Sequence, residues 1–600
     1  MSPAGLPLTT PLRPLPWFDP RLAPAITWAA ELLFAGLLYG PLFVPLNHFG
    51  IIDYDQFLAW QLAVNDALAS GQLLHWAHHF CGGVPGLADP QSGALSPFNL
   101  PGLFFNPVVQ MKISVAVHLL ACAAGFHLLA RRARWPVYFA IAAFVIWAGN
   151  GFIVFRLLHG QETFYPLLYL PLLLALLWPY LAADGEPGAL RRDLLAGAAL
   201  VSLMILEDGF QVLIYAGIFF GSAGLAAAIL RRDARALGML AAWMAWALAL
   251  CAMRLLPMAE LLREYPRITT EQDFLTPQMF ADAFFNPRQL ELYIGFQPSP
   301  PHNVWAAYGA FTGWAPFALF AWGVALAWSR RSQAFVPLLV AVLVCFLLML
   351  GHFAAWSPWA MLHSLPLMDM VRAPHRFASM VIFGVAIFAM FAQQDLLRRL
   401  HEREGAALLI ALAVAGVCAF GQIRALHPLL EAGFGAHQPP YRSIARDQPF
   451  VHRLIDSSRM YSAVASNAGA YNCYRALDLP NAVRPDFPLA TPMHDDSSVA
   501  ASIGPNTINL QIENRSAEII LINENYHRDW TVVAGRADRL ERSADGLMAL
   551  HVPPGSGGIR LRFVPRAFIA GAVMSLAVLL VSLLVISRWR EPGARRRASG

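Results

Sequence analysis

Charged residues are scarce in this sequence. Only 14% of its 600 residues are Asp, Glu, Lys or Arg, whereas 57% are hydrophobic. This balance excludes a soluble globular fold for the chain as a whole. Long apolar runs are correspondingly abundant, and a bilayer core of about 30 Å needs about 20 apolar residues per helix. The composition therefore predicts a polytopic α-helical membrane protein.

Paired-cysteine motifs are also absent. The six cysteines stand at positions 81, 122, 251, 345, 418 and 473, without a CxxC pair or a metal-ligand spacing. Cys81 and Cys473 both fall in segments predicted to lie outside the membrane and could form a disulfide, although nothing in the sequence requires one. A glycine-rich phosphate loop and a soluble cytoplasmic domain are missing as well, which argues against a nucleotide-sugar donor.

About twelve segments are predicted to span the membrane. They lie at residues 22–46, 111–130, 136–150, 164–182, 194–207, 210–230, 236–257, 308–328, 334–351, 376–394, 405–425 and 567–587. Arginine clusters follow every even-numbered segment, and short basic loops stay in the cytoplasm. We therefore expect both termini in the cytoplasm, every long loop outside, and the first span retained as an anchor. The net charge of +5 then comes from basic loops that set the orientation of the chain in the membrane. No nucleic-acid partner is expected.

The first external loop, residues 47–110, concentrates acidic, aromatic and turn-forming residues. Apolar residues recur at helical spacing from Phe57 to Gly71, which predicts an amphipathic helix on the membrane surface. Asp53 and Asp55 stand at its start. In one interpretation Asp53 only caps the helix, and Asp55 is only a first-turn residue that the helix dipole favours. In the other, Asp53 is a general base acting on a lipid-borne substrate, and the two interpretations are compatible.

Several short motifs resemble those of YfhO-type bacterial membrane proteins. The motifs are DYDQ at 53–56, Trp76, GGVP at 82–85 and DPQSGALSPFNL at 89–100, with HGQ at 159–161 and RAPHRF at 372–377 in later external segments. Those proteins belong to the C-type (GT-C) glycosyltransferases, which use polyprenyl-phosphate sugars. The resemblance implies that an aspartate of the first external loop is the catalytic base, here Asp53 with Asp55 as the competitor.

Further polar residues are candidates for substrate and metal binding. We expect substrate contacts from Trp76, Gln91, His159, Gln161 and Glu162, although the last three would also suit an ordinary solvated loop. Glu207 and Asp208 are costly so close to hydrocarbon and should face water or a cavity. With Asp55 they are candidate ligands for a divalent cation such as Mg²⁺ or Mn²⁺, which the sequence permits but does not require.

External arginines run against the positive-inside pattern at residues 372–377. Guanidinium groups bind phosphate through charge-assisted hydrogen bonds. We therefore predict that Arg372, His375 and Arg376 hold the lipid phosphate of a donor. The alternative is that the arginines form salt bridges with loop carboxylates such as Asp369.

Composition changes after the eleventh predicted span. We expect residues 1–426 to form a GT-C-like membrane domain, 427–565 an external β-sandwich-like domain, and 566–600 a final transmembrane helix with a basic cytoplasmic tail. Alternating strands are predicted at 507–512, 518–523, 531–534, 547–552 and 559–563, separated by turns that include PPGSGG at 553–558.

Together these features predict an inverting glycosyltransferase of the bacterial inner membrane with its active site on the external face. It would move a sugar from a polyprenyl-phosphate donor to an envelope glycan or lipid acceptor. Two rivals remain: a transporter or flippase of lipid-linked glycans, and a non-catalytic assembly factor for envelope polysaccharide. The transporter is disfavoured relative to the transferase because few charged residues fall near the predicted bilayer midplane.

Overall fold

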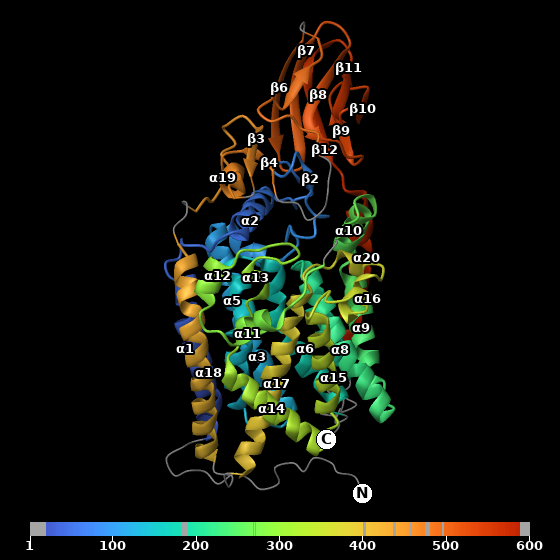
Figure 1. The fold of residues 1–600 in the computed structure, drawn as a ribbon. Coiled ribbons are helices and arrows are strands. Elements are labelled where there is room, and N and C mark those ends of the chain that lie inside the picture. The colour runs from blue at the N-terminus through green and yellow to red at the C-terminus, as the bar shows by residue number, and fades with distance from the viewer. Residues whose placement is uncertain are drawn as a thin grey trace.

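A helical bundle carries a β-rich unit at one end, with the first loop between them (Figure 1). The computed structural model describes residues 20–182, 190–267, 269, 272–399, 404–435, 440–456, 458–473, 481–494 and 497–587. The predicted cytoplasmic ends, at residues 1–19 and 588–600, lie outside the described residues.

All twelve predicted spans are helical in the structure. They correspond to α1 (Ala23–Phe43), α3 (Pro107–Arg132), α4 (Phe139–Ala148), α6 (Leu170–Leu181), α7 (Leu190–Leu206), α8 (Phe210–Arg231), α9 (Arg235–Leu250), α14 (Trp314–Ser329), α15 (Phe335–Met349), α17 (Ala378–Arg399), α18 (Glu404–Gly433) and α20 (Arg566–Ser587). Within the described residues, seven helical segments are long and apolar enough to cross a bilayer, or nine if two bent pairs each count as one.

The predicted number of twelve spans is therefore not reached. One reason is a break of 51° between α4 and α5 (Gly151–Leu158). Asn150 lies at this break and caps the second helix by accepting a hydrogen bond from Ile153 N at 3.1 Å. A break of 83° likewise separates α9 from α10 (Ala252–Glu264). The helices α14 and α15 have 16 and 15 residues, short of a full bilayer crossing.

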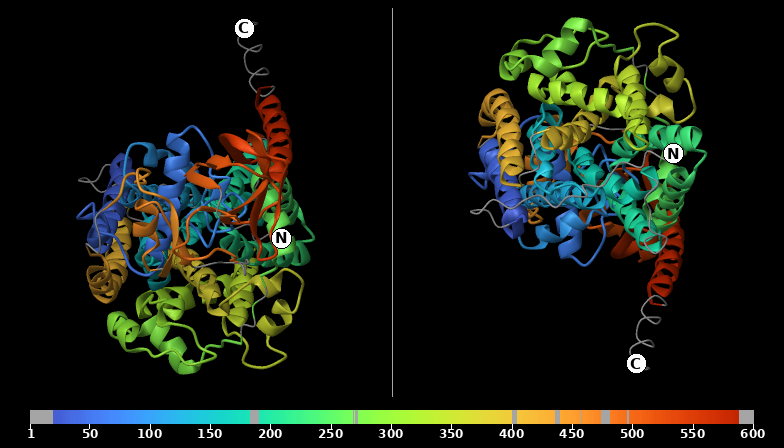
Figure 2. Two further views of the ribbon diagram at one scale, coloured as in Figure 1. Left: turned by 90° about the horizontal axis from the view of Figure 1, so that it is seen from above. Right: turned by 90° about the horizontal axis from the view of Figure 1, so that it is seen from below.

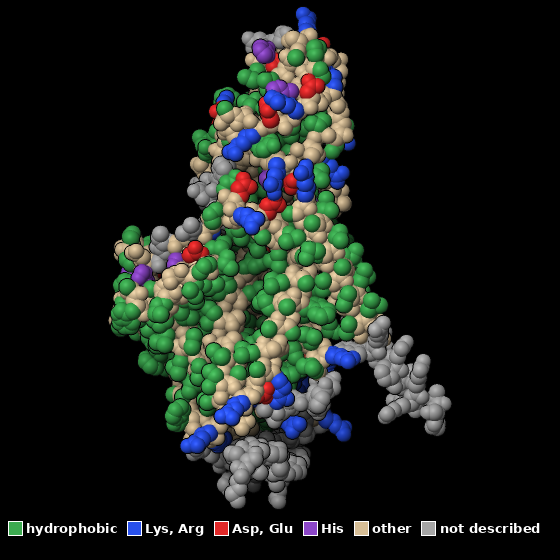
Figure 3. Space-filling model, turned by 90° about the vertical axis from the view of Figure 1, so that its right-hand side faces the viewer, with side chains coloured by type: hydrophobic (Ala, Val, Ile, Leu, Met, Phe, Trp, Pro, Cys, Tyr) green, Lys and Arg blue, Asp and Glu red, His purple; other side chains and the backbone are tan. Residues whose placement is uncertain are grey.

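The outer surface agrees with a membrane protein. Figure 3 shows a broad hydrophobic belt between two levels of charged side chains. Along the side of the bundle, α20 packs on α9 and α10 (Figure 2). Ser582 accepts a hydrogen bond from the indole of Trp246 at 2.9 Å, and Ser575 accepts one from Met253 N at 3.1 Å.

The C-terminal unit, from residue 440 to residue 563, is built around a sandwich of two four-stranded sheets. One sheet has the order β10-β11-β8-β5 and the other β6-β7-β12-β9. Alternate residues of both sheets form one apolar core, including Leu510, Ile522, Leu550 and Leu561, as strand periodicity requires. The strands are β5 (Ala490–Pro492), β6 (Ser498–Gly504), β7 (Thr507–Asn514), β8 (Glu518–Asn525), β9 (Trp530–Ala534), β10 (Arg539–Arg542), β11 (Leu547–Val552) and β12 (Gly555–Phe563).

All five predicted strands are confirmed, and the largest differences from the predicted boundaries are at the start of β12 and at the start of the domain. Residues 555–558, expected in a turn, extend β12 because they pair with the end of β7. At the other end, α18 continues to Gly433, so the predicted domain start at 427 lies inside a helix. The sandwich is preceded by the parallel strands β3 (Val451–Asp456) and β4 (Ala468–Asn472), with α19 (Met460–Ala465) between them.

The predicted surface helix exists as α2 (Asp53–Ala69), but it is buried within the protein instead of exposed at its surface. Thirteen of its 17 residues are buried, because α2 sits between the bundle and the C-terminal unit (Figure 1). Its N-cap is Ile52, at φ 59°, with no side-chain cap. The predicted capping role of Asp53 is therefore wrong. The first loop is also tied covalently to the C-terminal unit, by a disulfide between Cys81 and Cys473.

Candidate active site

Asp53 lies at the first position of α2 and faces the segment that follows α5. Its Oδ2 accepts a hydrogen bond from Gln161 Nε2 at 2.5 Å. The Oε1 of Gln161 accepts one from Arg156 Nη1, also at 2.5 Å. Arg156 is only 3% exposed and also donates to the carbonyl of Ala306. The half-buried carboxylate of Asp53 and the buried guanidinium of Arg156 are thus joined through the side-chain amide of Gln161.

A second guanidinium comes from the segment directly before α17. Arg376, in the short helix η6 (Pro374–Phe377), donates to Gln211 Oε1 at 2.5 Å. Its Cζ lies 5.1 Å from the ring centre of Phe164, and the Cζ of Arg156 lies 5.3 Å from the same ring. The two cations therefore share one aromatic ring. Neither has an ion pair within the described residues, since their partners are amides, a carbonyl and aromatic rings.

His159 and Tyr293 form the next part of this cluster. His159 Nε2 lies 3.2 Å from the hydroxyl of Tyr293, on α12 (Gln289–Gly295). Burial and the charge of Arg156 lower the pKa of His159 to about 3, so it is neutral at pH 7. Burial and the charge of Asp53 raise the pKa of Tyr293. The phenol is therefore available as a hydrogen-bond donor near Asp53.

Glu162 and Gln91 also contact α2. Glu162 accepts a hydrogen bond from Gln61, two turns along the helix from Asp53, and Gln56 donates to Gln91 at 3.4 Å. A small pocket is lined by Gln61, Gln91 and Glu162, among other residues. The structure thus brings Asp53, Gln161, His159 and Arg376 into one cluster, with Glu162 and Gln91 beside it.

The candidate metal ligands have separate partners. Asp208 binds Arg254 at 2.5 Å and accepts from Gly93 N at 2.7 Å; burial raises its pKa in spite of Arg254. Glu207 binds His118 at 2.7 Å. Asp55 accepts from Tyr461 N, at the start of α19, at 3.1 Å. Within the described ranges, no group of three or more His, Cys, Asp or Glu side chains could hold a metal ion.

Three other candidates lie outside the cluster or are engaged elsewhere. His375 pairs with Asp273 at 3.3 Å; burial opposes ionisation of Asp273, but His375 and Tyr308 outweigh it and lower its pKa to about 2. Arg372 is half-buried on the loop before α17. Trp76 is 1% exposed in the core of the sandwich, where its indole donates to Glu524 at 2.7 Å.

Sequence reasoning assigned no role to Arg156, Gln211 or Tyr293. Arg156 had a usable signal, because a lone arginine in the apolar run GFIVFRLL is costly unless a specific partner or function holds it. The sequence around Gln211 and Tyr293 contains no comparable signal. Their positions next to Arg376 and His159 depend on how α8 and α12 pack.

No family model and no curated protein sequence matches the chain. Among solved structures, it resembles ArnT from Cupriavidus metallidurans bound to undecaprenyl phosphate, with a TM-score of 0.45 and 14% identity over 73% of this chain and 84% of that one. It also resembles the Archaeoglobus fulgidus oligosaccharyltransferase, with a TM-score of 0.43 and 13% identity over 76% of this chain.

The chain spans 65% of the length of that oligosaccharyltransferase. A third likeness is to the arabinofuranosyltransferase AftD from mycobacteria, with a TM-score of 0.39 and 15% identity over 68% of this chain and 27% of that one. Structural similarities with such low TM-scores and sequence identities assign neither an activity nor the YfhO-type subfamily to this chain. The functional argument therefore rests on the cluster of Asp53, Arg156, Gln161 and Arg376.

Proposed function

We propose that the protein is a membrane glycosyltransferase that moves a sugar from a polyprenyl-phosphate donor to a hydroxyl group of an envelope glycan or lipid. The observation that supports this proposal best is the cluster itself. It sets one carboxylate beside two guanidinium groups that have no carboxylate partners of their own in the described residues. A general base and an anion site are the two parts that such a transfer needs.

Asp53 is the proposed base. Its carboxylate is not used to cap α2, and Gln161 binds only one of its oxygens. Asp53 takes the proton of the acceptor hydroxyl while that oxygen attacks the anomeric carbon. The bond from that carbon to the phosphate oxygen breaks, and its electron pair leaves with the lipid phosphate. The attack from the opposite side inverts the anomeric centre.

Arg156 and Arg376 are the proposed phosphate ligands. Two cations without anionic partners among the described residues are costly in a partly buried site, and a bound phosphate would offset that cost through charge-assisted hydrogen bonds. Arg372 stays a candidate for the same role. His375 is a weaker one, because Asp273 already engages it.

The disulfide supports an external active site. Disulfides persist mainly in oxidising compartments, and Cys81 belongs to the same loop as Asp53. The four free cysteines of the described residues are all buried. We therefore assign the first loop and the sandwich, as part of this proposal, to the external side of the bacterial inner membrane.

Paired substitutions test the proposal. Purified Asp53→Asn and Asp55→Asn proteins are incubated in liposomes with a radiolabelled polyprenyl-phosphate sugar and an envelope glycan acceptor. We expect Asp53→Asn to lower the release of lipid phosphate at least about 100-fold, since general-base catalysis contributes about that much or more. Asp55→Asn is the matched control, because an amide oxygen still accepts the hydrogen bond from Tyr461 N.

Equal and complete loss in both variants would contradict a distinct role for Asp53. Label that crosses the bilayer without bond cleavage would instead support the transporter. Binding of donor lipid with neither cleavage nor transport would support the assembly-factor hypothesis.

A further inference from the structure

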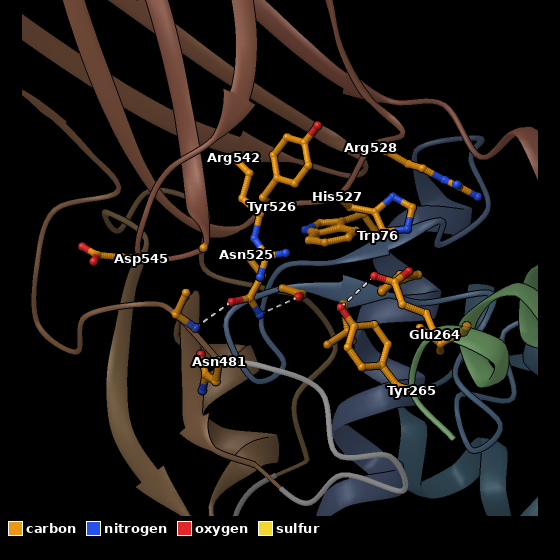
Figure 4. A pocket seen from close by; sticks show the side chains of 16 residues that line it. Trp76, Glu264, Tyr265, Asn481, Asn525, Tyr526, His527, Arg528, Arg542 and Asp545 are labelled. Carbon is orange, nitrogen blue, oxygen red and sulfur yellow. Dashed lines mark hydrogen bonds between the residues drawn. The ribbon is translucent and has the colours of Figure 1, made fainter. Parts of the chain in front are cut away.

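A second pocket lies away from the cluster, where the first loop, α10 and the sandwich meet (Figure 4). Its volume is about 230 Å³, and it is open to solvent on one side. Its lining comes from three parts of the chain that are distant in sequence, including Trp76, Tyr265 and Tyr526. The proposed catalytic mechanism uses none of these residues.

Three aromatic rings line this pocket. Tyr526 lies at the top and Tyr265 at the bottom of the view in Figure 4, with Trp76 between them. Both tyrosines are half-buried, so part of each ring remains available to a ligand. Rings of this kind offer large, rigid apolar faces together with a polar group at the edge. The CH faces and hydroxyl rim of a pyranose match that combination.

The pocket also contains an unsatisfied acceptor. Asn481 Nδ2 donates to Tyr471 O at 3.0 Å, but its Oδ1 is buried without a hydrogen-bond partner in the described residues. A buried polar atom in this state is unfavourable. Because this oxygen has less than 1 Å² of accessible surface, a ligand hydroxyl reaches it only after the Asn481 side chain turns toward the pocket. Asn525, by contrast, is fully engaged with Ala482 N, Cys81 O and Gly83 O.

The negative and positive charges of the residues that line the pocket balance each other. Glu264 and Asp545 carry negative charge, and Arg528 and Arg542 carry positive charge. Arg528 pairs with Glu260 just outside the pocket, and Asp545 pairs with Arg484 at 2.7 Å. Burial lowers the pKa of His527, so it adds no charge at pH 7. The pocket therefore lacks the excess positive charge that an acidic glycan would require.

A smaller hollow continues from the pocket toward the membrane domain. The two share Pro85, Leu261, Glu264 and His527, and the second is also lined by Phe568, near the start of α20. A saccharide in the pocket could therefore be attached to a lipid that enters beside α20, or it could be part of a free glycan.

We propose that this pocket binds a neutral oligosaccharide. Its role as the acceptor rests on the proposed function, but the binding itself does not depend on Asp53. Tyr265 and Tyr526 hold the sugar faces, and the Asn481 side chain turns to accept a hydrogen bond from a hydroxyl.

The test uses the full chain in lipid nanodiscs. Its ligands are fluorescently labelled neutral and acidic oligosaccharides, released from the lipid-linked and polysaccharide fractions of the producing cells. We expect saturable binding of neutral oligosaccharides, weakened about tenfold by Tyr526→Ala and by Tyr265→Ala, because each substitution removes one aromatic contact with the sugar; tenfold corresponds to about 1.4 kcal/mol. Phe487→Ala, at an exposed aromatic before β5 and outside the pocket, should bind like the wild type.

Binding of acidic oligosaccharides only, no binding at all, or equal binding by the tyrosine variants and the wild type would overturn the proposal. Thermal unfolding checks that each variant is folded. Lipid-linked saccharides placed in the nanodisc, compared with the same saccharides released, identify the source of the ligand. Asp53→Asn separates the two proposals, because it should bind oligosaccharide normally while losing transfer.

Discussion

Asp53 and Asp55 stand two positions apart on α2 and point in different directions. Two positions on an α-helix differ by about 200° around the axis. Asp53 consequently meets Gln161 of the bundle, whereas Asp55 meets Tyr461 N of the C-terminal unit. One carboxylate thus faces the cluster in the bundle, and the other holds α19 on α2.

At the residue scale, the two guanidinium groups give the sharpest prediction. Arg156→Gln and Arg376→Gln should each weaken binding of a polyprenyl-phosphate sugar about tenfold or more, because each removes a charge-assisted hydrogen bond of about 1.5–3 kcal/mol. The measurement is the dissociation constant in nanodiscs. Arg288→Gln, at an exposed arginine directly before α12, is the control. Unchanged affinity in both cluster variants would remove these arginines from the donor site.

At the element scale, the junction between the first loop and β8 is built around Glu524. This side chain is fully buried and accepts from the indole of Trp76 at 2.7 Å. His78 lies 2.9 Å and His452 3.5 Å from its oxygens. Gly83 completes the packing, since a Cβ there would lie 2.1 Å from Glu524 Oε1, and its φ is +90°.

This junction should weaken in acid. Burial opposes ionisation of Glu524, but His78 and His452 outweigh it and lower its pKa from 4.5 to about 2. Because the folded-state pKa is depressed, the stabilisation is complete above pH 4.5 and is lost as the pH falls toward 2. We expect Glu524→Gln to lower the unfolding temperature at neutral pH and to flatten its fall between about pH 5 and about pH 2.

Differential scanning fluorimetry across this pH range measures the effect. Glu513→Gln, at an exposed position of β7, should follow the wild-type curve. A wild-type unfolding temperature that stays constant across the same acidic range would contradict the role given to Glu524.

At the scale of the whole molecule, one covalent link joins the first loop to the C-terminal unit across 392 residues of sequence. Removing it by the double substitution Cys81→Ser and Cys473→Ser should cost about 3 kcal/mol, because a disulfide restricts the unfolded chain. Thermal unfolding of the double variant, compared with Cys418→Ala at a buried free cysteine, measures this cost.

Mass mapping of peptides from untreated cells tests the same link. We expect Cys81 and Cys473 to be recovered as a cross-linked pair. Free thiols at both positions in protein taken directly from the membrane would argue against an external location for this junction.

Local patterns determined much of the fold. Apolar length alone placed helices at all twelve predicted segments, and period-two alternation placed the five predicted strands, because both signals depend on near neighbours in the chain. The number of complete spans could not be obtained in this way. Asn150 caps α5 within one apolar run, and only the packed structure shows the resulting bend.

The sequence by itself determined a membrane-embedded helical protein with a β-rich C-terminal unit, and it identified Asp53, Gln161 and Arg376 as notable residues. Only the tertiary structure decided that Asp53 and Gln161 meet, and that Arg156 binds Gln161 and shares the Phe164 ring with Arg376. It also decided that Asp55 and Trp76 belong to the junction with the C-terminal unit. The physical reason is that composition and periodicity report burial along one element. The direction of a side chain, and the partner it meets, depend on the packing of elements that lie hundreds of residues apart.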